Sequence, residues 1–316
     1  MDTLPRRWAP LLAVLILGSA SARADFDLYA SLSDGSIARL DAGGSATSFV
    51  ASGSGLISPQ GIAFDTSGNL YVADPAGGSG GQTGSVEQFD RNGTALGSFV
   101  STNVNSPSGI AFDTSGYLYV ANFGDNTVSQ FDAGGTFLQP FAFSGLSAPV
   151  GLAFDKAGNL YVANSGDNTV EQFSAAGTDL GPFAATGLSN PQGLAFDKLG
   201  ILYVTNFGGN TIEKFSAGGI DLGVFAATGL NGPIGLAFGP DGTLYVANNL
   251  DGTIERFSAD GMDLGSFATG LAGPVFLAFR PDLKAVPEPG SLVILIGGLA
   301  SLAGYARLCR RDASNA

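Results

Sequence analysis

The side chains best suited to chemistry are acidic and amide residues that follow short apolar segments at regular intervals. They are Asp74, Asn122, Asn164, Asn206 and Asn248. Carboxylate and amide oxygens are calcium ligands, so a ring of these residues could hold calcium. One carboxylate among neutral amides would bind the ion weakly, and Asn also satisfies turn backbone at the end of a strand. The second interpretation is the simpler one, so we expect no cofactor and leave weak calcium association open.

Catalytic groups of the common kinds are missing from the sequence. It contains no histidine, which removes His-based metal sites, Ser-His-Asp triads and imidazole acid-base catalysis. Four aspartates, Asp65, Asp113, Asp155 and Asp197, recur before x-x-Gly turns, where Asp commonly caps the turn through the backbone. We therefore predict no catalytic residue.

A repeated unit of roughly 42 residues must position these side chains. The unit reads Pro-x-Gly-[Ile/Leu]-Ala-Phe-Asp-x-x-Gly-x-Leu-Tyr-Val and contains four short apolar runs separated by turn residues. Four antiparallel strands per unit are typical of a β-propeller blade. Units begin at Pro59, Pro107, Pro149, Pro191 and Pro233, with a truncated one at Pro274. In the unit from Pro149 the expected strands are Gly151–Asp155, Leu160–Asn164, Thr169–Phe173 and Asp179–Ala184.

The ends of the repeat region complete one another. Residues Leu28 to Phe49 match the last three strands of a unit, and Val275 to Phe279 match the first strand. We therefore predict an all-β, six-bladed propeller over residues 25–285, closed by pairing the three N-terminal strands with the C-terminal strand in blade six. Aromatic residues that recur at one place in every unit are expected to form its core.

If the recurring Asp and Asn residues bind a ligand, they do so at the mouth of the central channel of the propeller. The loop into the innermost strand and the loop after the second strand lie on the same face of a propeller. The candidate ligand site comprises Gln60, Asp74, Asn122, Asn164, Gln192, Asn206 and Asn248. A Gly-rich insertion from Pro75 to Gly84 interrupts the symmetry beside Asp74, and it is either a gate or partner loop or a tolerated linker.

The two ends of the chain carry export signals. Residues 1–24 have the order of a secretory signal peptide, with Arg6 and Arg7, an apolar run and Ser21 to Ala24. Residues 286–316 contain an uncharged stretch followed by arginines, which predicts one C-terminal transmembrane helix with the propeller outside the cytoplasm. A plain stop-transfer anchor is the alternative.

That tail resembles the PEP-CTERM sorting signal, through a Pro-Glu-Pro motif, a single span and a short Arg cluster. The matching residues are Pro287, Glu288, Pro289, Arg307, Arg310 and Arg311. The resemblance implies a Gram-negative host that makes exopolysaccharide. It also implies that the C-terminal helix anchors the protein transiently in the inner membrane. An exosortase-type sorting enzyme then processes the protein, which is delivered to the cell surface or the extracellular space.

The repeat unit resembles the NHL repeat and, more distantly, the senescence-marker/gluconolactonase propellers. The second resemblance implies a metal-dependent, lactonase-like hydrolase with its site at the channel mouth, but the acids that such enzymes use there are replaced by Gln60, Val150 and Val275. The net charge of −13 makes nucleic acid a poor partner. Our first hypothesis is therefore a non-enzymatic binding or scaffold module for an exopolysaccharide or a surface protein, and the hydrolase is the alternative.

Overall fold

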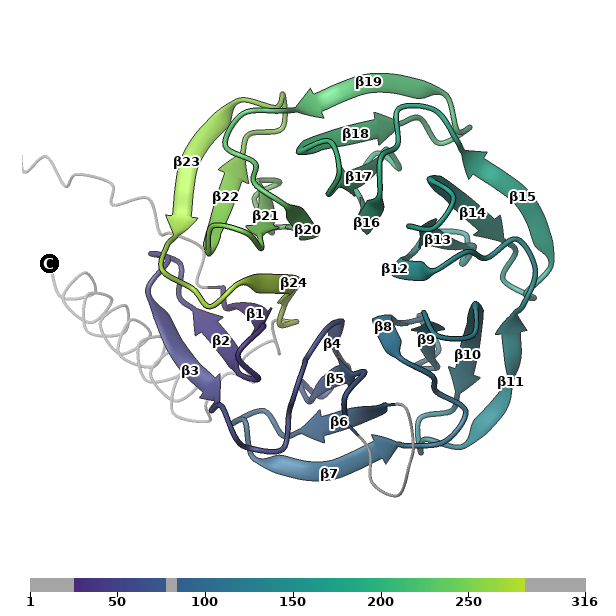
Figure 1. The fold of residues 1–316 in the computed structure, drawn as a ribbon, viewed down its shortest axis with the longest axis vertical. Helices are drawn as coiled ribbons and strands as arrows, with labels where there is room; N and C mark the ends of the chain where they lie inside the picture. The colour runs from purple at the N-terminus through teal and green to yellow at the C-terminus, as the bar shows by residue number, and fades with distance from the viewer. Residues whose placement is uncertain (1–25, 78–83, 282–316) are drawn as a thin grey trace, which may run out of the picture.

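The computed structural model describes residues 26–77 and 84–281, whose regular elements are all β-strands. They form six four-stranded sheets arranged in a ring (Figure 1). The all-β, six-bladed propeller is therefore confirmed. The predicted signal peptide, the transmembrane helix and the sorting motif lie outside the described residues. Within those residues, no helix has the length and apolar character needed to span a bilayer.

The first three blades follow one another along the chain, each with its innermost strand first. Blade one contains β4 (Ile62–Phe64), β5 (Leu70–Asp74), β6 (Ser85–Phe89) and β7 (Ala95–Val100); blade two contains β8 (Pro107–Phe112), β9 (Leu118–Asn122), β10 (Thr127–Phe131) and β11 (Phe137–Ala142); blade three contains β12 (Pro149–Phe154), β13 (Leu160–Asn164), β14 (Thr169–Phe173) and β15 (Asp179–Ala184).

The remaining blades complete the ring. Blade four contains β16 (Pro191–Phe196), β17 (Leu202–Asn206), β18 (Thr211–Phe215) and β19 (Asp221–Ala226); blade five contains β20 (Pro233–Phe238), β21 (Leu244–Asn248), β22 (Thr253–Phe257) and β23 (Asp263–Ala268); blade six contains β24 (Pro274–Phe279), β1 (Leu28–Leu32), β2 (Ile37–Leu40) and β3 (Ala46–Val50).

Turn chemistry explains the strand ends. In blade three the last three strands have the expected bounds, whereas β12 begins at Pro149 and ends at Phe154. The next residue, Asp155, caps the hairpin because its Oδ1 accepts hydrogen bonds from the N–H groups of Ala157 and Asn159 at 2.8 and 2.9 Å. The predicted capping role of this aspartate column is confirmed.

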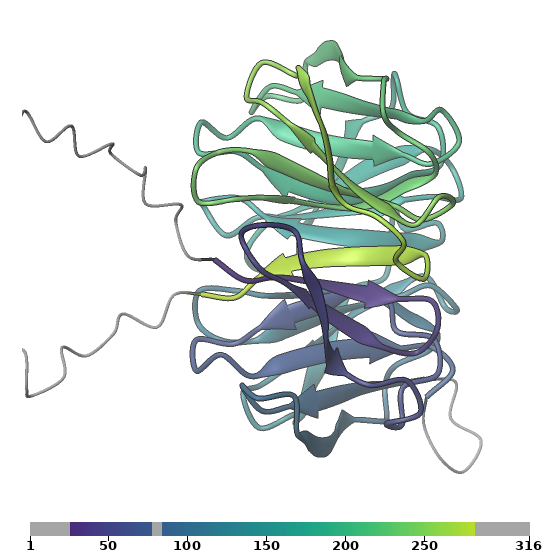
Figure 2. The ribbon, with the colours of Figure 1, turned by 90° about the vertical axis from the view of Figure 1, so that its left-hand side faces the viewer.

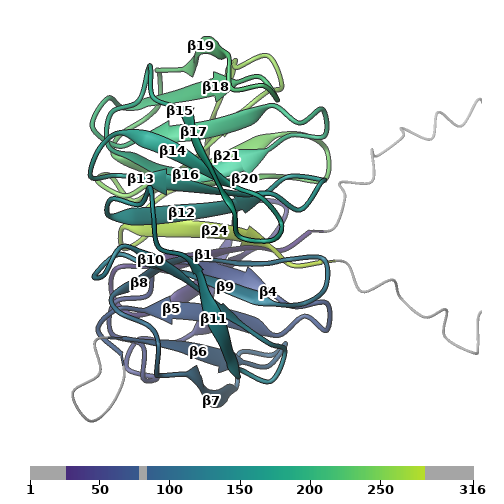
Figure 3. The same cartoon turned by 90° about the vertical axis from the view of Figure 1, so that its right-hand side faces the viewer.

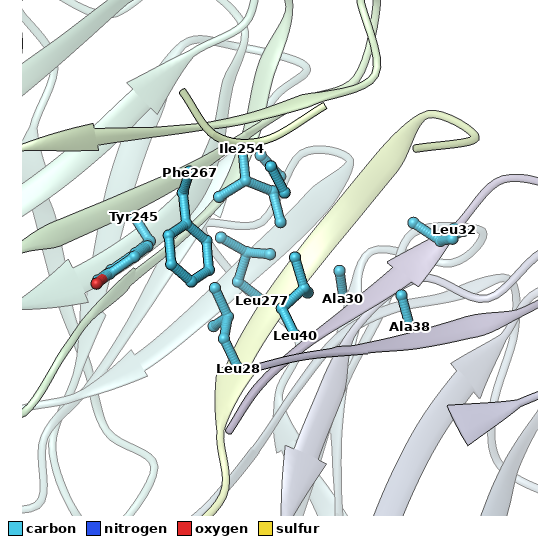
Figure 4. Close-up of a cluster of buried hydrophobic side chains, with 11 residues drawn as sticks. Leu28, Ala30, Leu32, Ala38, Leu40, Tyr245, Ile254, Phe267 and Leu277 are labelled. Atoms are coloured by element: carbon cyan, nitrogen blue, oxygen red, sulfur yellow. The ribbon is translucent and has the colours of Figure 1, made fainter. Parts of the chain in front are cut away.

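Blade six joins the two ends of the described chain. Its strand β24 pairs antiparallel with β1, with Leu28 opposite Phe279. Beside this pair, Asp27 forms salt bridges with Arg39 and Arg280. A cluster of buried side chains that includes Leu28, Leu277 and Phe267 fills the seam between blades five and six (Figure 4).

The ring has two distinct faces. One carries both ends of the described chain and the hairpins between first and second strands, and we call it the hairpin face (Figure 2). The opposite face carries the loops that run from each outermost strand to the next blade, and we call it the crossover face (Figure 3).

Aromatic contacts connect each blade to the next. Tyr161 of β13 lies edge-on to Phe183 of its own blade and to Phe196 of the next, with ring centroids 4.8 and 4.9 Å apart. Every blade repeats this arrangement, so the tyrosine column is core, as expected. The phenylalanines at the ends of the innermost strands are only partly buried, because they face the hairpin side of the ring.

Candidate functional site

The predicted ring of Asn residues is buried inside the crossover face. Asn164 has no exposed surface. Its Nδ2 group donates to the carbonyl of Gly145 at 2.8 Å and to Thr169 Oγ1 at 3.1 Å, while Oδ1 accepts from the N–H of Ser147 at 3.2 Å. Gly145 and Ser147 belong to the crossover loop that leads into the same blade. The side chain therefore fastens that loop to the end of β13.

The other members of the ring also fasten a loop to the end of the second strand of their blade. Asn206 and Asn248 repeat the three contacts in blades four and five. In blade two, Asn122 accepts from the N–H of Asn105 and donates to two hydroxyls. In blade one, the carboxylate of Asp74 accepts four backbone N–H groups, from Ile57, Ser58, Ala76 and Gly77.

For five of the seven residues of the expected ligand site, these contacts support the other interpretation, in which the side chain satisfies loop backbone. The side chains of Asp74, Asn122, Asn164, Asn206 and Asn248 are buried, and their oxygen atoms accept hydrogen bonds from loop backbone. Gln60 and Gln192 are half-buried and bond within their own loops, to Ser58 and Asn190. Across residues 26–77 and 84–281, no three acidic or sulfur side chains gather as a metal site would require.

We expect Asn206→Ala to lower the free energy of unfolding by about 2 to 3 kcal/mol, since the buried Asn206 side chain loses three part-buried hydrogen bonds. Urea denaturation measures the loss. The exposed Asn92, whose side chain lies on a hairpin, provides the control, and Asn92→Ala should change stability by less than about 0.5 kcal/mol. Equal effects of the two substitutions would contradict the fastening role.

A wide hollow lies on the hairpin face instead. A cavity of about 980 Å³ extends over blades two, three and four, between their first hairpins. Its floor includes the rings of Phe112, Phe154 and Phe196 from the innermost strands, and its walls carry the polar residues of the hairpins. This volume is at the upper end of the range of about 300 to 1,000 Å³ that is usual for ligand pockets.

Hydrogen-bonded groups fix the polar walls. The hydroxyl of Tyr161 donates to Asp155 Oδ2 at 3.2 Å, and Gln172 Nε2 donates to the same hydroxyl at 2.6 Å. Burial, together with the neighbouring Asp155 carboxylate, raises the pKa of Tyr161 well above its usual range, so the hydroxyl stays protonated. Blade two repeats this network with Tyr119, Asp113 and Gln130.

Two lysines bridge neighbouring hairpins at the cavity. Lys156 Nζ donates to the carbonyl of Lys198, and Lys198 Nζ donates to the carbonyl of Pro240 at 3.0 Å. Both lysines line the cavity, as does the ring of Tyr117, which is 38% exposed. Sequence reasoning missed these residues. The available signal was that Lys156 and Lys198 occupy one position of the repeat, where blades one and two have threonine.

Comparison with known proteins identifies the fold. No protein-family model matches the chain, and no curated protein matches it. Among solved structures, a chain from the structure titled "Crystal structure of Nidogen/Laminin Complex" matches with a TM-score of 0.69 and 21% sequence identity, over 81% of this chain and 98% of that chain. The likeness is one of fold. At this identity it supports the six-bladed propeller and leaves the ligand to be argued from the site.

Proposed function

We propose that the chain is an exported, surface-sorted propeller of NHL-like repeats that acts as a non-enzymatic binding module in the cell envelope or extracellular matrix. The cavity over blades two to four carries this proposal. Export is supported by the signal-peptide pattern of residues 1–24, and surface sorting by the PEP-CTERM-like order of residues 286–316. An exosortase-type enzyme would then be a partner during maturation.

A glycan segment of an exopolysaccharide is the ligand that fits the cavity lining. The carboxylates of the hairpin aspartates accept hydrogen bonds, the ammonium groups of Lys156 and Lys198 donate them, and the hydroxyls of Thr114 and Ser115 do both. Sugar hydroxyls offer donors and acceptors in the same mixture. The exposed ring of Tyr117 adds an apolar surface on which a sugar face can lie.

The position of the chain ends agrees with this ligand. Both ends of the described chain lie at the hairpin face (Figure 2). Next to them, Phe26 packs on Phe279 and Arg280 pairs with Asp27. A C-terminal tail attached to a surface would therefore begin on the same face as the cavity. In that orientation the cavity would open toward the surface to which the tail is attached, where the polymer would lie.

The test is retention of the purified protein on immobilised exopolysaccharide, with affinity measured by calorimetry on its oligosaccharides. Tyr117→Ala should weaken binding about tenfold, which corresponds to about 1.4 kcal/mol of lost aromatic contact. Phe143, which is 75% exposed and lies in a crossover loop, supplies the control, and Phe143→Ala should leave affinity unchanged. Equal losses in both variants, or no binding by the unaltered protein, would refute the glycan site.

A further inference from the structure

The repeat allows each blade to be compared with its neighbours, and blade four departs from them on its hairpin face. Leu199 stands where blades one, two and three have Ser67, Ser115 and Ala157. Two residues later, Ile201 replaces the polar Asn69, Tyr117 and Asn159. On the neighbouring strand β18, Lys214 replaces Gln88, Gln130 and Gln172. Blades five and six also have a cation in that column, Arg256 and Arg39, but among the five blades with a complete first hairpin only blade four combines the cation with two aliphatic side chains.

All three replacements line one pocket. It lies between the hairpins of blades four and five and has a volume of about 380 Å³. Phe196, Tyr203 and Phe238 form the inner part of its lining, and Leu222 of β19 adds a further aliphatic wall. The Asp197–Lys198 hairpin borders both this pocket and the larger cavity over blades two to four. The two sites are therefore neighbours with different linings.

The fold does not require these aliphatic groups. Leu199 is 85% exposed, the highest value among the exposed large apolar residues of the described chain, and Leu222 is 46% exposed. Serine or alanine closes the equivalent turn in three other blades. Apolar side chains left in water beside a pocket gain free energy when an apolar ligand covers them.

Two ammonium groups give the pocket a positive side. Lys214 and Lys198 both line it, and within the described residues neither forms an ion pair with a carboxylate. Lys214 Nζ lies 5.8 Å from the ring centroid of Phe225, and Lys198 Nζ donates to a backbone carbonyl. The nearby Asp197 uses its Oδ1 to accept the N–H groups of Leu199 and Ile201. In a chain of net charge −13, unpaired cations beside an apolar pocket favour an anionic ligand.

We propose that this pocket binds a small amphiphile with an apolar chain and an anionic head, namely a medium-chain fatty carboxylate. The chain lies along Leu199, Ile201 and Leu222, and the carboxylate pairs with the ammonium of Lys214, with Lys198 as the second cation. The volume is at the small end of the range of about 300 to 1,000 Å³ for ligand pockets, which suits a single short chain. This site shares Phe196, Asp197 and Lys198 with the proposed glycan cavity, but its aliphatic lining and Lys214 belong to it alone, so the proposal does not rest on glycan binding.

The test measures binding of decanoate to the full chain by calorimetry, below the concentration at which decanoate forms micelles. Decanol and decyltrimethylammonium serve as probes with the same chain and a neutral or cationic head. We expect decanoate to bind at least tenfold more tightly than either. Equal affinity for the three probes, or no decanoate binding, would overturn the proposal.

Two substitutions that restore the residue of another blade separate the contributions of head and chain. Lys214→Gln should weaken decanoate about tenfold and leave decanol unchanged, because it removes only the cation. Leu199→Ser should weaken both probes, because it removes an apolar wall. Tyr117→Ala, at the glycan cavity, should change neither. If decanoate binds Lys214→Gln and Leu199→Ser as it binds the unaltered chain, the assignment to this pocket is wrong.

Discussion

Replacing Gly151 by alanine should lower the free energy of unfolding by about 3 kcal/mol or more, because the added methyl group has no space at the centre of the ring. A Cβ atom at this position would lie 2.1 Å from the carbonyl oxygen of Gln192, in the innermost strand of the next blade. The obstacle is backbone, so no side-chain rotation relieves it. The loss should appear as a lower urea midpoint and a lower melting temperature.

The same close approach recurs around the ring, which makes the effect hard to absorb. A Cβ atom at Gly109 would meet the carbonyl of Val150 at 2.1 Å, and one at Gly193 would meet that of Ile234 at 2.4 Å. If the added methyl group displaces one innermost strand, that strand in turn clashes with the innermost strand of the following blade. The matched control is Gly218, an exposed hairpin glycine with open space around it and no positive φ, where alanine should be neutral.

The sixth copy shows how the fold accommodates a larger group. There the column holds Phe276, whose ring packs against the buried cluster that contains Ile62 and Leu70. The adjoining innermost strand β4 has three residues, whereas the other innermost strands have six. If Gly151→Ala proves as stable as Gly218→Ala, the innermost strands must be free to separate, and the axial glycines would need another explanation.

Sequence reasoning predicted the fold well because its signals are local and repeated. Turn residues such as those after Asp155 fix the strand ends within a few positions, and recurrence at Pro107, Pro149 and Pro191 gives the blade period. Truncated units at both ends limit the number of blades. The turn signals depend on contacts between residues that are close in the chain. The blade period depends on the recurrence of the same residue at equivalent positions of successive units.

The candidate site could not be predicted as well, because its contacts depend on paths between blades. The recurrence of Asn at the position of Asn164 can be read from the sequence. Whether its side-chain oxygen points to the ring axis or to the loop at Ser147 depends on the path of the crossover loop from the previous blade. The hairpin-face cavity is assembled from three units and has no motif of its own. Side chains that differ between copies, such as Lys156 and Leu199, were the remaining signal.

Raising the pH from about 4.5 to about 7 should destabilise the propeller through three buried glutamates. Glu171, Glu213 and Glu255 are only 3 to 5% exposed and lie beside Asp179, Asp221 and Asp263. Burial first, and then the neighbouring aspartate, raise the pKa of Glu171 and Glu213 from 4.5 to about 7; the pKa of Glu255 is also raised. Crossover-loop glycines cover two of the carboxyls, so little water reaches them.

The direction of the effect follows from proton binding. The folded chain keeps protons on these glutamates that the unfolded chain releases near pH 4.5, so their stabilisation is complete below that pH and is lost as the pH rises through 7. Each unit of raised pKa corresponds to about 1.4 kcal/mol, so Glu171 and Glu213 together amount to several kcal/mol, and Glu255 acts in the same direction. Hydrogen bonds from the Ser144 hydroxyl, first, and from the N–H of Gly181 lower the pKa of Asp179. Asp179 therefore changes the free energy of unfolding only below about pH 3.8, outside the range from pH 4.5 to 7.

Melting curves between pH 4.5 and 8 test this, with the triple variant Glu171→Gln, Glu213→Gln and Glu255→Gln as the comparison. Glutamine keeps the shape of the protonated acid, so the variant should melt with the unaltered protein at pH 4.5 and at least about 5 °C above it at pH 8. Glu87 occupies the same column but has Ala95 where the others have aspartate, so Glu87→Gln is the control and should keep the original pH profile. A triple variant that loses stability with pH as the unaltered protein does would show that other groups govern the response.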